Sequence, residues 1–201
     1  MNRMEYDLVG EMAVDADAYY GIHALRAAEN FPITHTRLPG DMIVSMAWIK
    51  KACARANRVT GALSSRVAEA IERACDELID GKLHDQFIVD PIQGGAGTST
   101  NMNANEVIAN RAIELLGGVK GDYTLVPPND HVNCGQSTND IYPTCVKMTL
   151  YRASESLRRE MEALVSVLEE RAADFDGVIK MGRTVVQRSM LFAGGTAAGI
   201  L

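Results

Sequence analysis

The sequence contains few aromatic residues and no long apolar run. Phe, Trp and Tyr make up only 5% of the 201 residues, whereas alanine is abundant. Alanine loses little on entering a helix and gives a β-sheet little to pack, so this composition favours a mainly α-helical protein. No stretch approaches the ~18 consecutive apolar residues of a membrane-spanning helix, and the N-terminus lacks a signal-peptide run. We therefore predict no membrane association and a cytoplasmic location.

The sequence also lacks cysteine pairs, clustered histidines and an excess of positive charge. Its four cysteines (Cys53, Cys75, Cys134 and Cys145) form no CxxC motif, which predicts reduced thiols in a cytosolic protein. Its four histidines are scattered and none has HExxH-like spacing, so we predict no metal site. The net charge of −6, with dispersed Lys and Arg, argues against a nucleic-acid partner.

Helix signals dominate after an irregular segment over residues 1–37, in which two short extended pieces surround Gly10. Turn residues and helix caps bound three predicted helices, over residues 42–59, 65–80 and 98–116. We therefore predict an N-terminal helical domain over residues 1–140.

One predicted helix is much longer than the others. Apolar residues recur every three or four positions from Val146 to Phe175, close to the helical period of about 3.6. We expect a helix over residues 142–175, which would be ~50 Å long. An apolar stripe of this length needs other long helices beside it. We interpret residues 141–184 as the start of a helix bundle and residues 185–201 as a divergent tail.

A glycine-rich segment, QGGAGTSTN over residues 93–101, precedes one predicted helix. It lacks the Gly-Lys-Ser/Thr ending of a phosphate loop. The free backbone N–H groups and the helix dipole at such a position suit a carboxylate as well as a phosphate. Thr98 is a candidate ligand residue. The alternative is that Thr98, Ser99 and Thr100 only cap the helix.

Two further polar segments carry uncharged donors. The residues Ser137, Thr138 and Asn139 directly precede the long helix, where they could either bind a small carboxylate or form an elaborate cap. The segment KMGRT, over residues 180–184, predicts a turn with Thr184 near its tip. His131 is more typical of a hydrogen-bonded structural histidine than of a catalyst.

Taken in order, these segments resemble the aspartase branch of the aspartase/fumarase superfamily. The resemblance runs from about residue 5 to residue 184. It rests on DAYYGIH (17–23), GGAGTSTNMNANEV (94–107), NDHVN (129–133), QSTND (136–140) and KMGRT (180–184).

The resemblance implies a reaction, a fold and a set of site residues. L-Aspartate would be deaminated to fumarate and ammonia, without an organic cofactor, through β-proton abstraction and a dianionic aci-carboxylate. Thr98, Ser137 and Thr138 would bind the carboxylate that becomes the aci-form. Asn139 would contact the substrate near its amino group, and Thr184 would line the same pocket.

The resemblance also implies a homotetramer whose long helices form a shared bundle, with each active site drawn from three subunits. We therefore expect a homo-oligomer that forms through residues 142–175. Thr98 and the residues 137–139 need not converge within one chain.

The resemblance ends abruptly after Thr184. The family's usual His or Gln is replaced by Val185, which loses a possible amino-group contact, and only Gln187 keeps its place in the following motif. The family's later loop, with its base serine, does not occur in the 201 residues. We interpret the sequence as the N-terminal portion of a truncated or frameshifted reading frame that is inactive alone. The alternatives are a fumarate hydratase-like lyase and a non-catalytic helical fragment or interaction protein.

Overall fold

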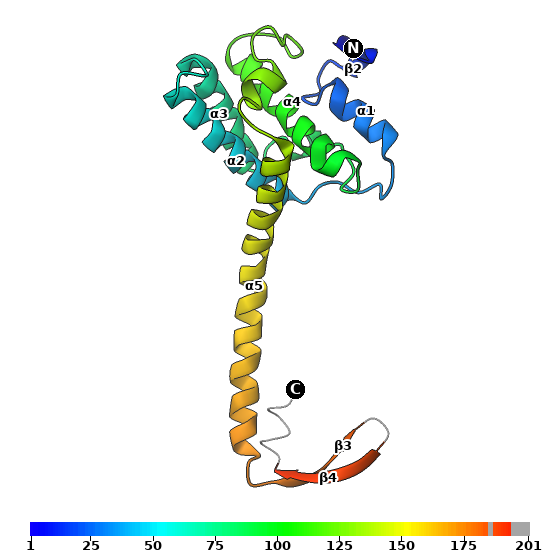
Figure 1. The fold of residues 1–201 in the computed structure, drawn as a ribbon, viewed down its shortest axis with the longest axis vertical. Helices are drawn as coiled ribbons and strands as arrows, with labels where there is room; N and C mark the ends of the chain where they lie inside the picture. The colour runs from blue at the N-terminus through cyan, green and yellow to red at the C-terminus, as the bar shows by residue number, and fades with distance from the viewer. Residues whose placement is uncertain (185–186, 194–201) are drawn as a thin grey trace. The chain divides into compact units, whose positions relative to one another are not determined.

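The computed structural model describes residues 1–184 and 187–193, with side chains described for residues 1–179. The chain divides into two compact units, Met1–Thr149 and Leu150–Leu201. Helices account for most of the described residues, which confirms the predicted mainly α-helical class (Figure 1).

The first unit begins with a β-hairpin. Strands β1 (Asn2–Asp7) and β2 (Gly10–Asp15) pair antiparallel. The Asp7 carboxylate closes the turn by accepting the backbone N–H groups of Val9 and Gly10 at 2.9 and 3.0 Å. Gly10 has a φ of +141°, which side chains other than glycine rarely adopt. Two extended pieces around Gly10 are confirmed, although Leu8 and Val9, which we assigned to the first piece, form the turn.

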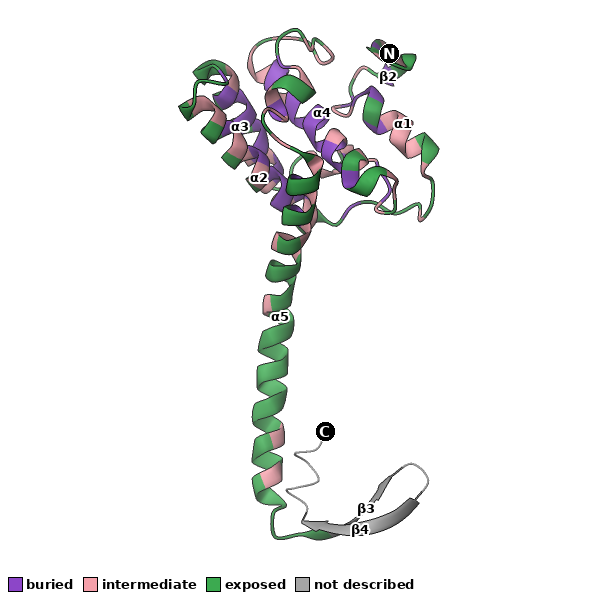
Figure 2. Ribbon diagram, viewed as in Figure 1, coloured by how far each residue is buried: buried purple, intermediate pink, exposed green. Residues whose placement is uncertain are grey.

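Four helices enclose the core of the first unit: α1 (Ile22–Asn30), α2 (Gly40–Val59), α3 (Ser65–Ile79) and α4 (Thr98–Leu115). Helix α3 contacts both α2 and α4, and α4 also contacts α1. Figure 2 shows buried residues where these helices meet. In α4 the buried residues lie on nearly every face of the helix. The three helices predicted over residues 42–59, 65–80 and 98–116 are confirmed to within two residues at each end.

Three short helices lie in the connections: η1 (His84–Gln86), η2 (Gly95–Gly97) and the π-helical η3 (Pro128–Val132). Helix η2 leads directly into α4, and η3 packs against α4. Helices η2 and η3 thus place the segment before α4 and the segment before the long helix next to α4.

The long helix α5 (Thr138–Asp174) contains 37 residues without a break. The 3.6-residue period predicted it correctly, except that it begins four residues earlier than Tyr142. Pro143 is the sixth residue of α5 and lies beyond the four N–H groups that lack helical partners, so it removes the backbone hydrogen bond to the Asn139 carbonyl, and the helix continues past it. In the second unit Leu157 and Leu164 are 62% and 58% exposed. No helix among the described residues is both long and apolar enough to cross a membrane.

The second unit also contains an antiparallel hairpin of β3 (Ile179–Thr184) and β4 (Gln187–Ala193). The segment over residues 180–184 had been predicted as a turn, and this prediction is wrong. The segment pairs with residues that follow it, with Lys180 opposite Phe192. Backbone pairing with a strand from the tail therefore overrides the local turn signal of Gly182.

Candidate active site

The N-termini of α4 and α5 lie next to each other within the first unit. Gly97, the residue before α4, has a φ of +91°. A Cβ atom there would come within 2.2 Å of Cγ in the Tyr142 ring of α5. Gly97 therefore meets two requirements at once, a left-handed backbone and a close approach between the two helix starts.

Thr98 is the first residue of α4 and its side chain is exposed. Its hydroxyl donates to the Gly95 carbonyl at 2.5 Å. The capping contact of this helix comes instead from Gln93, whose Oε1 accepts the Thr100 N–H at 2.7 Å. The Gln93 amide also donates to the Thr100 hydroxyl at 2.8 Å. Thr98 is thus not the residue that caps α4.

The donors before the long helix are arranged differently from one another. Ser137 is exposed, and its hydroxyl oxygen accepts the Asn139 N–H at 3.2 Å, so it does cap α5. Thr138 is half-buried, and its oxygen accepts from the side-chain amide of Asn101 in α4 at 3.0 Å. Asn139 is exposed. Capping thus accounts for one lone pair of Ser137 and leaves its own hydroxyl hydrogen available.

The two predicted site segments therefore converge in one chain, which the sequence had not required. The 3.0 Å contact between Asn101 and Thr138 joins the first turns of α4 and α5. Two helix N-termini together place positive dipole ends and short neutral donors at one position. Such an arrangement can bind a small anion without a charged side chain.

A buried lysine of α2 forms hydrogen bonds with the loop that precedes α5. Lys50 is 0% exposed, and its Nζ donates to Asn133 Oδ1 at 2.9 Å and to Gln136 Oε1 at 2.8 Å. Burial lowers the pKa of Lys50 to about 7. Both the charged and the neutral amine have enough N–H groups for the two bonds. Lys50 thus fixes the loop that leads into α5.

The sequence analysis missed Lys50, whereas Asn101, Asn133 and Gln136 lay within the quoted segments but were given no role. A signal for Lys50 was present, because it follows Met46 and Ala47 at helical spacing on the apolar face of α2. A lysine on such a face is almost never fully buried without polar partners. Asn101 ends the polar segment 93–101 at the start of α4, but nothing in the local sequence indicates its contact with Thr138.

The remaining candidates contribute less to this geometry. Thr184 ends β3 in the second unit, and its side chain lies outside the described ones. His131 lies in η3, and its buried Nδ1 has no hydrogen-bond partner among the described residues. Within the described residues, no group of three or more His, Cys, Asp or Glu side chains could hold a metal ion.

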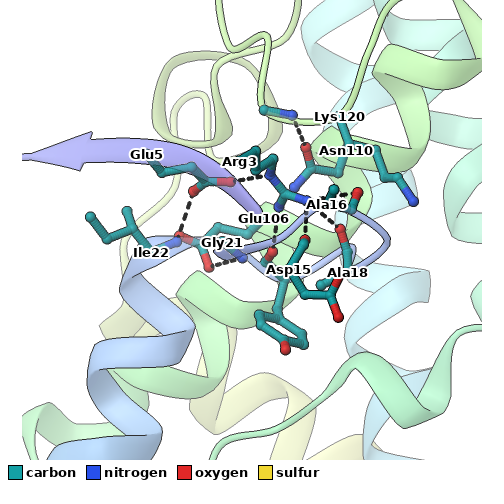
Figure 3. Close-up of polar contacts among 12 residues, drawn as sticks. Arg3, Glu5, Asp15, Ala16, Ala18, Gly21, Ile22, Glu106, Asn110 and Lys120 are labelled. Carbon is teal, nitrogen blue, oxygen red and sulfur yellow. Dashed lines mark hydrogen bonds and ion pairs between the residues drawn. The ribbon is translucent and has the colours of Figure 1, made fainter. Parts of the chain in front are cut away.

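A second cluster of hydrogen bonds holds the DAYYGIH segment (residues 17–23) against α4 (Figure 3). The buried Glu106 carboxylate of α4 accepts the backbone N–H groups of Gly21, His23 and Ala24 at 2.9 to 3.0 Å, at the start of α1. Its hydrogen bond to the His23 ring raises the pKa of that histidine. Gly21 is required because a Cβ there would lie 2.5 Å from the Tyr123 hydroxyl. These hydrogen bonds therefore hold the start of α1 against α4.

Replacing Glu106 with glutamine is expected to destabilise the chain by roughly 3 kcal/mol, because the amide nitrogen would face buried N–H donors. Urea unfolding followed by circular dichroism measures this change. Glu69→Gln on exposed α3 is the matched control, because its Arg58 pair is solvent-exposed, and should change stability by less than about 0.5 kcal/mol. Equal stabilities for the two variants would contradict the locking role of Glu106.

The fold and the site define a helical protein in which two adjacent helix N-termini carry exposed, uncharged donors. The chain belongs to the lyase family, whose model, described as "Lyase", matches residues 10–191. This confirms the family resemblance inferred from the motifs.

The similar proteins include aspartate ammonia-lyases from several bacteria. The chain is 54% identical over 185 residues to that of Bacillus subtilis (strain 168), covering 92% of the chain and 39% of the relative. It is 52% identical over 187 residues to that of Helicobacter pylori (strain J99), covering 92% and 40%. The chain therefore spans about two fifths of the length of these relatives.

Solved structures show the same fold. A structure described as fumarate lyase:delta crystallin from Brucella melitensis, in native form, superposes with a TM-score of 0.89 at 44% identity. The match covers 100% of this chain and 47% of the other. A class II fumarase from Schistosoma mansoni gives a TM-score of 0.87 at 36% identity, covering 99% and 42%.

Proposed function

We propose that this chain forms part of a carbon–nitrogen lyase that converts L-aspartate to fumarate and ammonia without an organic cofactor. The observation that carries the proposal is the convergence of hydroxyl and amide donors at the adjacent N-termini of α4 and α5. The aspartate ammonia-lyases among the relatives support this substrate, and their identity to the chain is higher than that of the class II fumarase.

In this proposal each donor has a role in charge stabilisation. Thr98, Ser137 and Thr138 bind the carboxylate beside the carbon that loses its proton, and Thr98 gives up its hydrogen bond to the Gly95 carbonyl to do so. Asn139 contacts the substrate near its amino group, and Thr184 lines the same pocket. Removal of a weakly acidic C–H proton places a second negative charge on the carboxylate, and preorganised donors lower the energy of that state most.

Charge stabilisation alone does not transfer a proton. A general base must lie within hydrogen-bond reach of the proton that it removes. The resemblance assigns the base to a serine loop that the 201 residues do not contain. A polypeptide limited to these residues should therefore bind a dicarboxylate without turning it over.

The purified 201-residue chain is accordingly expected to release no fumarate from L-aspartate, as measured by ultraviolet absorbance. Fumarate itself should shift the backbone amide NMR signals of residues 137–139, which shows that the chain is folded and binds. Binding of L-aspartate and of L-malate, compared through the same signals, separates the fumarase alternative, which requires L-malate to bind more tightly. Turnover of either substrate would refute the assignment of the base, whereas absence of any fumarate binding would refute the carboxylate site.

The partners and location follow from the same proposal. The chain forms a homo-oligomer through the apolar face of α5, and the enzyme acts in the cytoplasm on a small dicarboxylate. The exposed Leu157 and Leu164 support this oligomer. The same exposed side chains are the one observation that favours the alternative, a non-catalytic interaction protein.

A further inference from the structure

A continuous chain of hydrogen bonds connects the buried Lys50 of α2 to Thr138 at the start of α5. Lys50 Nζ donates to Asn133 Oδ1 at 2.9 Å. The same oxygen accepts from Asn101 Nδ2 at 3.1 Å, and Asn101 Nδ2 also donates to Thr138 Oγ1 at 3.0 Å. Lys50 and Asn101 are at most 1% exposed, so water does not compete for these bonds.

The direction of this chain follows from the contacts of Asn133. One side-chain amide atom of Asn133 faces the Gln136 backbone carbonyl at 3.2 Å, and a carbonyl can only accept, so that atom is the nitrogen. The Asn133 atom that faces Lys50 is therefore the amide oxygen. A second neighbour of that oxygen must also donate, which places the Asn101 amide nitrogen toward Asn133. The other hydrogen of the same nitrogen then points to Thr138, so the Thr138 oxygen is an acceptor within this network.

Thr138 is therefore left with a hydroxyl hydrogen that its contact with Asn101 does not use. No acceptor for it occurs among the described residues. The opposite orientation of Asn101 would direct the Thr138 hydrogen inward, onto an amide oxygen. Asn101 Oδ1 is instead buried without a hydrogen-bond partner among the described residues, which costs free energy.

We propose that Asn101 and Lys50 are positioning residues that hold the Thr138 hydroxyl as a hydrogen-bond donor toward the bound carboxylate. The identity of the ligand rests on the proposed function, whereas the direction of the network does not. Lys50 and the Gln136 backbone carbonyl together fix the orientation of Asn133, Asn133 fixes that of Asn101, and Asn101 occupies the oxygen of Thr138. The hydroxyl is thereby preorganised for negative charge before any ligand arrives.

The direction can be measured without a ligand, from the side-chain amide signals of Asn101 in ¹⁵N–¹H spectra of the 201-residue chain. Thr138→Val removes the acceptor, so one Asn101 amide proton should shift upfield and exchange faster with solvent. Thr138→Ser keeps a hydroxyl oxygen and should restore the native signal. An Asn101 amide that is unchanged in Thr138→Val would overturn the proposal.

The effect on binding is measured by titration with fumarate. Asn101→Asp offers only acceptor oxygens, which draw the Thr138 hydrogen inward, and it also adds a negative charge. Ser99→Asp adds the same charge in the same helical turn without that contact, and is the matched control. We expect Asn101→Asp to weaken fumarate binding about tenfold more than Ser99→Asp, which corresponds to the loss of one hydrogen bond to a charged group.

A double-mutant cycle distinguishes positioning from a general structural role. In the Thr138→Val background, Asn101→Asp and Lys50→Met should each weaken fumarate binding no more than Ser99→Asp does, because no hydroxyl remains to orient. Equal losses in both backgrounds would overturn the proposal. If the unmodified chain bound no fumarate, the proposed function would fail, while the Asn101 amide signals would still decide the direction of the network.

Discussion

Replacing both Leu157 and Leu164 with glutamate is expected to convert the purified chain from a self-associating species into a monomer. These side chains lie one above the other on α5, two turns apart, and are 62% and 58% exposed. Burying two such side chains between chains contributes roughly 3–6 kcal/mol, and two buried carboxylates would reverse that gain. Size-exclusion chromatography with light scattering measures the change in mass.

The matched control places the same two charges on another face of the helix. Ser156→Glu with Ala163→Glu has identical spacing, but is turned by about 100° around the helix axis. Both positions are exposed, and this variant should remain associated. An unmodified chain that was monomeric at tens of micromolar would contradict the role of this face, as would equal behaviour of the two double variants.

Gly97→Ala is expected to destabilise the first unit by about 2–5 kcal/mol, through left-handed backbone strain together with overpacking. The added Cβ would come 2.2 Å from the Tyr142 ring, which would force the starts of α4 and α5 apart. Urea unfolding measures the loss of stability. Weakened fumarate binding in the same variant would show that the separation of the two helix starts disturbs the site.

Gly117→Ala is the control for this substitution. Gly117 has a similar φ of +86°, and an added Cβ there would meet nothing within 4 Å. It should therefore report backbone strain alone, about 1–2 kcal/mol. Equal losses at the two glycines would mean that contact with Tyr142 does not set the spacing of the helix starts. A partial recovery in Gly97→Ala with Tyr142→Ala would confirm that it does.

The sequence predicted elements whose signal is local and periodic. Helix α5 was recognisable because its apolar residues repeat at the helical period over many turns, and its start was misplaced only because Ser137 caps it earlier than Tyr142. The segment over residues 180–184 was predicted wrongly, because a glycine within a short polar run indicates a turn as well as a strand. Its pairing with residues 187–193 is not visible in local propensity.

The candidate site was likewise predicted only in part from the sequence. Thr98, Ser137 and Thr138 were identifiable because hydroxyl residues at helix starts have a limited set of roles. That α4 and α5 begin side by side, and that Ser137 caps its helix while Thr98 does not, depended on Gln93 and Tyr142. The Gln93 contact lies within one segment of the chain, whereas Gly97 and Tyr142 are adjacent only after the helices have packed.

By itself, the sequence determined the helical class, the ends of α2, α3 and α4 to within two residues, the long apolar face and the family, since each of these is encoded in periodicity, caps or ordered motifs. Only the tertiary structure decided that the buried Lys50 reaches Asn133 and that Asn101 donates to Thr138. The physical reason is that a hydrogen bond depends on distances of about 3 Å between atoms from separate helices. No local pattern fixes such distances, and only the packing of α2, α4 and α5 does.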